Sequence, residues 1–160
     1  MDSWAPTRIF LSDDHPFVRR GLRNILEAAG KYEVCGEAGD GKVTLELAMQ
    51  LRPDVVITDI SMSPPNGLEV AAQLRQALPK IKILIMTMHD SEEMLRAAMR
   101  AGATGYLLKS DPEELLGIAL QCLEEGKCFV SPAFSSELAK RLVAEVLRKE
   151  DQRVSSPGNM

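Results

Sequence analysis

Short runs of apolar residues recur along the chain, and each run ends at polar or turn-forming residues. The clearest run lies in residues 54–59, where four apolar or β-branched residues lead into Asp59 and a turn over 63–67 follows. A short apolar run with such boundaries is typical of a strand buried on both faces of a parallel sheet. Similar or alternating patterns predict four more strands, at 8–12, 32–38, 81–87 and 104–108.

Between these runs, apolar residues recur every three or four positions, which is the period of a helix that buries one face. The pattern predicts five helices, near 16–29, 41–51, 67–78, 92–101 and 112–125. Pro16 suits the first turn of the first helix, and Gly30 is expected to end it. Strands and helices that alternate with short loops predict a flavodoxin-like α/β fold, a doubly wound parallel sheet of five strands with helices on both faces.

A sixth helix is predicted beyond this alternation. Residues 128–130 read as a short extended piece, Ser131 and Pro132 are expected to start the helix, and its apolar residues form one stripe. The helix is interpreted either as an extra layer on the domain or as a linker to another domain. We therefore expect an N-terminal tail at 1–6, one folded domain at 7–127, a linker helix at 128–150 and a disordered polar tail at 151–160.

Composition narrows the class of protein. A hydrophobic content of 45% and a charged content of 26% are typical of a globular domain, and the net charge of -4 argues against non-specific nucleic-acid binding by this chain. No apolar run is long enough to span a bilayer, and the first six residues lack the pattern of a signal peptide. The three cysteines lack metal-ligand spacing and indicate reduced, buried thiols, so we expect a cytoplasmic protein without a membrane partner.

Polar side chains follow four of the predicted strands. Asp13 and Asp14 come after the first, Asp59 after the third, Thr87 after the fourth and Lys109 after the fifth. Open α/β folds bind ligands at this carboxyl edge. Three converging carboxylates repel one another, and a hard divalent cation with oxygen ligands, Mg²⁺ or Mn²⁺, relieves that repulsion. A phosphoryl group beside the metal would use the lysine and the hydroxyl as donors, with Asp59 as its covalent acceptor.

Each of these signals is weak alone, because an Asp pair before a helix is most often a cap and a single lysine is most often a solvated surface residue. Together, however, the residues resemble the residue set of the response-regulator receiver domains of two-component signalling. Residues 13–22 and 101–109 look like the NarL/FixJ type, found in LuxR-type transcriptional regulators. The resemblance covers about residues 7–130 and implies a CheY-like fold.

The resemblance also implies a role for each site residue. Asp59 would become the aspartyl phosphate and would hold Mg²⁺ directly together with Asp14. Asp13 would act on the metal through water, and the backbone carbonyl of Ser61 would complete the protein ligands. Thr87 would hydrogen-bond the phosphoryl oxygens.

Two further residues belong to the implied switch. Lys109 would pair with the charge of the phosphoryl group. Tyr106 matches the aromatic residue whose inward rotation accompanies activation in these domains. From the residues themselves, His15 is interpreted as a helix cap and His89 as a residue at the entrance of the site.

The sequence departs from the receiver pattern at two positions. Receivers usually carry proline four residues after the acceptor, where this chain has Ser63 followed by two prolines. Many receivers also have proline after the lysine, where this chain has Ser110. A cis peptide without proline is costly, so we expect the Lys109–Ser110 bond to be trans or locally strained.

The resemblance implies a phosphorylation-controlled receiver, not an enzyme, whose partner is a sensor histidine kinase. Output would be transcription, through a DNA-binding helix-turn-helix domain expected after the linker and outside these 160 residues. The alternative is a stand-alone receiver that acts by protein contacts. A homodimer through the first and fifth, or the fourth and fifth, helices is a further expectation.

Two rivals from other classes remain. A haloacid-dehalogenase-type phosphatase also uses an aspartate nucleophile, but it carries a second aspartate two residues later, where this chain has Ser61. A flavin binder of the flavodoxin kind needs a Ser/Thr/Gly-rich phosphate loop after the first strand, where this chain has acidic residues.

Overall fold

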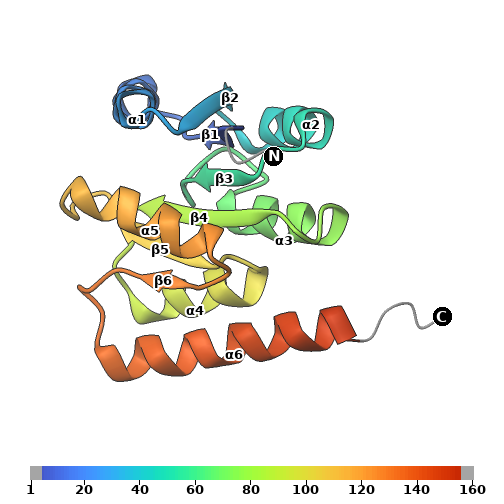
Figure 1. Ribbon diagram of the computed structural model, residues 1–160, viewed down its shortest axis with the longest axis vertical. Helices are drawn as coiled ribbons and strands as arrows, with labels where there is room; N and C mark the ends of the chain where they lie inside the picture. Colours follow the sequence, from blue (N-terminus) through green and yellow to red (C-terminus); the bar gives the residue numbers. More distant parts are fainter. Residues whose placement is uncertain (1–4, 156–160) are drawn as a thin grey trace.

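The computed structural model describes residues 5–155, with side chains described up to Lys149. Its centre is one parallel sheet with the strand order β2-β1-β3-β4-β5-β6 (Figure 1). The strands are β1 (Thr7–Ser12), β2 (Tyr32–Ala38), β3 (Val55–Thr58), β4 (Lys82–Thr87), β5 (Gly105–Leu108) and β6 (Phe129–Val130). The helices are α1 (Pro16–Ala29), α2 (Gly41–Leu51), α3 (Gly67–Ala77), α4 (Glu92–Ala101), α5 (Glu114–Glu124) and α6 (Ser136–Ser155).

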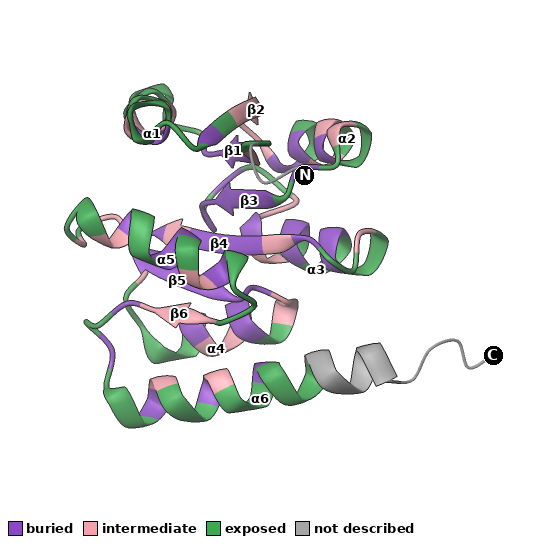
Figure 2. Cartoon of the chain, in the orientation of Figure 1, coloured by how far each residue is buried: buried purple, intermediate pink, exposed green. Residues whose placement is uncertain are grey.

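The helices cover both faces of the sheet, as the alternating pattern predicts. Helices α1 and α5 lie on one face, and α2, α3 and α4 lie on the other (Figure 1). Successive residues of a strand point to opposite faces, so Ile9 and Leu11 join one apolar cluster while Phe10 joins the other. The middle strands are mostly buried on both sides, and Figure 2 shows β3 and β5 in purple and β4 in purple with pink stretches. This double burial explains why their sequences are apolar throughout.

Within residues 5–155 the structure has six strands and six helices, so the expectation of a five-stranded sheet is wrong, while the sixth helix predicted at the C-terminal end is present. The extended piece at 128–130 contains β6, which pairs in parallel with β5 through Gly105 with Phe129 and Tyr106 with Val130. Two residues are too few to show a strand period. Pairing with β5 therefore decides the conformation of this piece, and a single segment gives no sign of it.

Helix α6 begins later than the sequence predicts. The hydroxyl of Ser131 accepts a hydrogen bond from the N–H of Ala133 (3.2 Å), and the residues up to 135 form a turn. Ser135 then takes the capping role, because its hydroxyl accepts from the N–H of Leu138 (3.2 Å). The helix continues to Ser155, into the stretch for which disorder is predicted, and residues 1–4 and 156–160 of the two predicted tails lie outside the described residues.

The predicted helix boundaries near the site agree with the structure. Gly30 ends α1 in the left-handed conformation with φ of 81°, and Asp40 caps α2 by accepting from the N–H of Val43. His15 occupies the cap position of α1, but its side chain makes no capping hydrogen bond. The interpretation of His15 as the cap residue is therefore confirmed for its position, while its ring turns toward the neighbouring aspartates.

Gly67 lets the start of α3 approach the loop after β3. Its N–H donates to the carbonyl of Ile60 (2.9 Å), and a Cβ at this position would overlap the carbonyl oxygen of Asp59. We expect Gly67→Ala to lower the free energy of unfolding by about 1–3 kcal/mol, because the loop must shift to admit the methyl group. Urea denaturation measures this change.

Gly117 in α5 provides the matched control. A Cβ there would meet no heavy atom within 4 Å, so Gly117→Ala is expected to stabilise the protein by about 0.5–1 kcal/mol. If Gly67→Ala and Gly117→Ala unfolded at the same urea concentration, the close approach at Gly67 would be contradicted.

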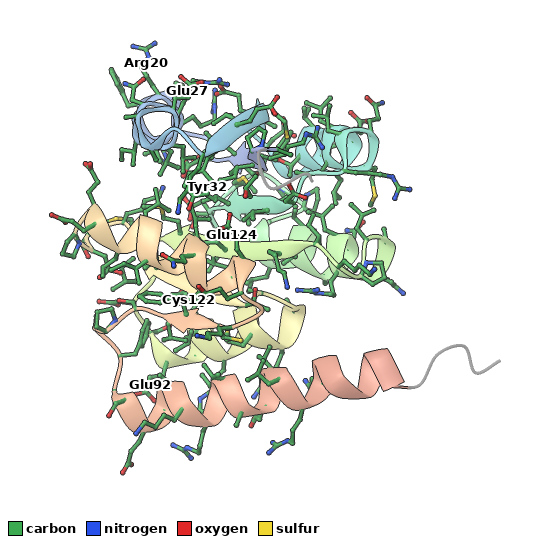
Figure 3. All side chains as sticks on the ribbon, viewed as in Figure 1. Arg20, Glu27, Tyr32, Glu92, Cys122 and Glu124 are labelled. Carbon is green, nitrogen blue, oxygen red and sulfur yellow. The ribbon has the colours of Figure 1, made fainter. Side chains whose placement is uncertain are left out.

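The cysteines are free thiols, as expected. Cys35, Cys122 and Cys128 are half-buried, so they are less enclosed than the sequence predicts, and Cys122 lies on α5 (Figure 3). Burial raises the pKa of the Cys35 thiol above its ordinary value. Among the described residues, no helix combines the length and the apolar character that crossing a membrane requires.

Candidate functional site

The fold brings four of the predicted strand-end residues to one place. The chain runs from β1 outward to β2 and then returns to β3 on the other side of β1, which opens a crevice at the carboxyl ends of β1 and β3. Asp13 and Asp59 follow these two strands, and the N–H of Asp59 donates to the carbonyl of Ser12 (3.0 Å). Thr87 ends β4, and Lys109, after β5, donates its N–H to the Thr87 carbonyl (2.8 Å).

Lys109 joins the two buried carboxylates. Its Nζ lies 2.8 Å from Oδ2 of Asp13 and 2.8 Å from Oδ2 of Asp59. The two aspartate side chains are each 4% exposed and the lysine side chain is 12% exposed, so water screens this triad only weakly. One ammonium group therefore holds two carboxylates in a fixed position at the carboxyl edge of the sheet.

The protonation states follow from these contacts. Burial raises the pKa of Asp59, but hydrogen bonds from Lys109 and the Thr87 hydroxyl outweigh it and leave this pKa below its ordinary value. Burial lowers the pKa of Lys109, and its bonds to Asp13 and Asp59 reverse that effect and raise it. At neutral pH Asp59 is thus an ionised carboxylate and Lys109 is a cation.

The second oxygen of Asp59 faces the loop after β3. Its Oδ1 accepts from the N–H of Ile60 (2.6 Å) and, at 3.4 Å, is close to the N–H of Ser61. The side chain is therefore held at both oxygens, by the backbone on one side and by Lys109 on the other. Such fixation orients a nucleophile before a substrate arrives.

Asp14 and His15 lie on the solvent-exposed side of the site. The Asp14 side chain is 44% exposed, and His15 Nδ1 lies 2.9 Å from its Oδ1 and 3.1 Å from Oδ1 of Asp13. One ligand atom from each of Asp13, Asp14, His15 and Asp59 fits within 4.8 Å of the others. Three carboxylates face one ammonium group, and this excess of negative charge with mostly oxygen donors suits a hard divalent cation.

His89 connects the loops around the site. Its Nε2 and the Ser61 hydroxyl are 2.7 Å apart, its N–H lies 3.4 Å from the Thr87 hydroxyl, and its carbonyl accepts from the Tyr106 hydroxyl (2.7 Å). The Tyr106 ring is fully buried, so it already occupies an inward position. The sequence places His89 at the entrance of the site but gives no sign of these three contacts, whose partners lie in the loop after β3, at the end of β4 and in β5.

The loop after β3 accommodates the two prolines without displacing the acceptor. Within residues 5–155 the cis peptide bond is Pro64–Pro65. The Lys109–Ser110 bond is therefore trans, which is one of the two predicted possibilities. Asn66 caps α3 through a reciprocal capping box with Glu69, so the loop ends in a defined helix start.

Comparisons with known proteins agree with this arrangement. Residues 9–120 match the response regulator receiver domain family. The chain is 40% identical over 146 residues to the uncharacterized transcriptional regulatory protein YxjL of Bacillus subtilis, covering 91% of this chain and 65% of that protein. The chain thus spans about two thirds of the length of this relative.

Two solved structures are also similar. A two-component response regulator of the LuxR family from Aurantimonas sp. has a TM-score of 0.77 and 33% identity, covering 89% of this chain and 99% of that one. The isolated receiver domain of RcsB from Salmonella enterica, solved with the phosphomimetic BeF3-, has a TM-score of 0.74 and 28% identity, covering 86% and 99%. The family match covers more than half of the 160 residues and includes the ends of β1, β3, β4 and β5. The chain belongs to the family of response regulator receiver domains.

Proposed function

We propose that this chain is a phosphorylation-controlled switch in which Asp59 accepts a phosphoryl group from a histidine kinase or a small acyl phosphate, with Mg²⁺ present. The observation that carries the proposal is the buried triad of Lys109, Asp13 and Asp59 at the crevice of a doubly wound sheet. An ammonium group that already contacts the acceptor carboxylate is positioned to pair with the charge that the phosphoryl group brings.

The transfer needs no general base at Asp59. The pKa of this carboxyl is lowered, so the oxygen that attacks phosphorus is ionised at neutral pH. A new bond forms between an Asp59 carboxylate oxygen and phosphorus while the bond from phosphorus to the donor breaks, and the leaving group keeps that electron pair. If the donor is a phosphohistidine, the leaving imidazole nitrogen takes a proton from water; if it is an acyl phosphate, the leaving group departs as a carboxylate and needs no proton.

Asp13, Asp14, Asp59 and the backbone carbonyl of Ser61 would hold Mg²⁺. The ion would neutralise charge on the phosphoryl oxygens, as divalent cations do in phosphoryl transfer. On the protein side, Lys109 would pair with a phosphoryl oxygen and Thr87 would donate its hydroxyl to another. The phosphoryl charge of about -1.5 to -2 would transfer the contacts of both residues from the Asp59 carboxylate to the phosphoryl oxygens and shift the surface formed by α4, β5 and α5.

The position two residues after Asp59 argues against a phosphatase. A haloacid-dehalogenase-type enzyme needs a second aspartate there as its general acid. Ser61 occupies the position, and its hydroxyl contacts His89 Nε2. The site therefore has a phosphoryl acceptor but lacks the carboxyl group that this class of phosphatase uses for protonation.

Transcription is the proposed output. The relative YxjL is named a transcriptional regulatory protein, and this chain matches about two thirds of it. We infer that α6 leads toward a DNA-binding domain outside these residues, and that the phosphorylated surface controls this domain or a homodimer. A receiver that acts by protein contacts alone remains the second candidate.

Intact mass spectrometry tests the proposed chemistry. The wild-type chain is incubated with acetyl phosphate and Mg²⁺, in parallel with a sample in which EDTA removes the metal. The expected result is one added phosphoryl group with Mg²⁺ and none with EDTA, and peptide mapping should locate the group on Asp59. No added mass in any sample would contradict the proposed function.

A further inference from the structure

A segment beyond the family match is tied to the strand that carries Tyr106. We name residues 131–146 the C-terminal strap; it runs from the end of β6 into α6. Ser131 is 1% exposed, its N–H donates to the Tyr106 carbonyl (2.8 Å) and its hydroxyl donates to Oδ1 of Asp111 (3.1 Å). The other carboxylate oxygen of Asp111 accepts from the N–H of Leu108 (2.9 Å). The strap is thus fixed to the backbone of β5 at its first residue.

Phe134 is the residue of the strap that contacts the Tyr106 side chain. The two rings meet edge to face, with centroids 5.6 Å apart and planes at 79°. Phe134 is 9% exposed, and the burial of Tyr106 is complete. Contacts of this geometry are favourable beyond their buried area, because the positive edge of one ring faces the negative face of the other.

The rest of the strap packs on α4. Leu138, Leu142 and Val146 are buried on one stripe of α6 and belong to the apolar cluster that contains Leu95 and Tyr106. Figure 1 shows α6 alongside α4 at the end of the sheet where β6 lies. The strap therefore packs on the domain as an additional layer.

Tyr106 also contacts the phosphoryl site on its other side. Its hydroxyl donates to the carbonyl of His89, the residue whose N–H approaches Thr87 and whose ring contacts Ser61. A continuous series of contacts thus links Phe134 to both loops that surround Asp59. If Tyr106 left its buried position, His89 would lose a hydrogen-bond partner.

We propose that Phe134 is a positioning residue for phosphoryl uptake: it holds Tyr106 in the buried position and thereby keeps His89, Thr87 and Ser61 arranged around Asp59. This inference rests on the proposed function. Docking of Phe134 and phosphorylation of Asp59 then favour the same conformation, the one in which Tyr106 is buried. Because coupling between two sites is reciprocal, binding of a phosphoryl mimic at Asp59 must strengthen the docking of Phe134 on Tyr106 by the same factor by which this docking strengthens binding of the mimic.

The first test measures the affinity for beryllium fluoride, a phosphoryl mimic, in the presence of Mg²⁺. Phe134→Ala is expected to weaken binding about fivefold or more, the lower range of measured coupling. The matched control is Leu142→Ala, which also removes buried apolar volume from the strap but leaves the Phe134 ring on Tyr106. We expect Leu142→Ala to bind as the wild type does, whereas equal weakening in both variants would overturn a specific role for Phe134.

The second test uses the wild-type chain, so it does not depend on how well a variant folds. Hydrogen exchange of peptides from the strap is measured with and without beryllium fluoride and Mg²⁺, and Asp59→Asn is the control. We expect beryllium fluoride and Mg²⁺ to slow hydrogen exchange of the strap peptides in the wild type and to leave it unchanged in Asp59→Asn. Unchanged or faster exchange would overturn the inference. If the wild type binds no beryllium fluoride, the proposed function fails; if it binds and Phe134→Ala binds equally well, only the role of Phe134 fails.

Discussion

Asp59→Asn is expected to gain no phosphoryl group from acetyl phosphate and Mg²⁺ under conditions in which the wild-type chain gains one. The substitution keeps the size of the side chain and an oxygen that can accept from the N–H of Ile60. It removes the negative charge and the nucleophilic carboxylate oxygen. The loss is complete, because an amide does not form an acyl phosphate by displacement at phosphorus. Intact mass after the same incubation measures it.

Asp54→Asn is the matched control for this prediction. Asp54 precedes β3 at the opposite edge of the sheet, is exposed and accepts from the N–H of Arg8 (2.8 Å). This variant loses one carboxylate near the same strand and is expected to take up phosphoryl as the wild type does. If Asp59→Asn still gained a phosphoryl group, the acceptor would be Asp13 or Asp14, the carboxylates next to Asp59 in the site.

The sheet order and the position of the site follow from sequence rules. Strands buried on both faces give continuous apolar runs, and alternation with helices forces a parallel sheet, so the polar residues after β1, β3, β4 and β5 must share one edge. These rules do not predict β6 or the residue at which α6 begins. The conformation of β6 depends on pairing with β5, and Ser131 is used for bonds to Tyr106 and Asp111 instead of a helix cap.

The sequence also leaves open which contacts form within the site. Neighbouring aspartates differ because the buried Asp13 points to Lys109 while Asp14 stays at the exposed rim. Phe134 acts through a partner that packing brings to it, because Tyr106 lies 28 positions earlier in the numbering. Periodicity reports which face a residue occupies, and it does not report which side chain of another element it meets.

Lys109→Met is expected to lower the free energy of unfolding by about 3–5 kcal/mol at neutral pH without metal. The methionine leaves Asp13 and Asp59, each 4% exposed, as two like charges without their shared cation. The repulsion between the two carboxylates and the cost of burying them without a cation both destabilise the folded state. Urea denaturation with EDTA present measures the loss.

The size of this loss should depend on pH. In the wild type the pKa of Asp59 is lower in the folded state than its ordinary value near 3.8, so the unfolded chain binds the proton more readily. The stabilisation by the triad is therefore complete above that value and is lost as the pH falls through the lower folded pKa. The pKa of Lys109 is raised above 10.5, so on the alkaline side the stabilisation is lost only as the pH rises through that higher value.

Three comparisons separate this electrostatic cause from a general effect of losing a lysine. Lys127→Met removes a lysine whose side chain is 69% exposed and pairs with Glu125, and it should change stability by less than about 1 kcal/mol. In the double variant Asp59→Asn/Lys109→Met one of the two charges is gone, so the loss should be smaller than in Lys109→Met alone. Mg²⁺ should stabilise Lys109→Met more than the wild type, because it replaces the missing positive charge. A loss that is independent of pH and of Mg²⁺ would show that Lys109 contributes through packing of its alkyl chain instead.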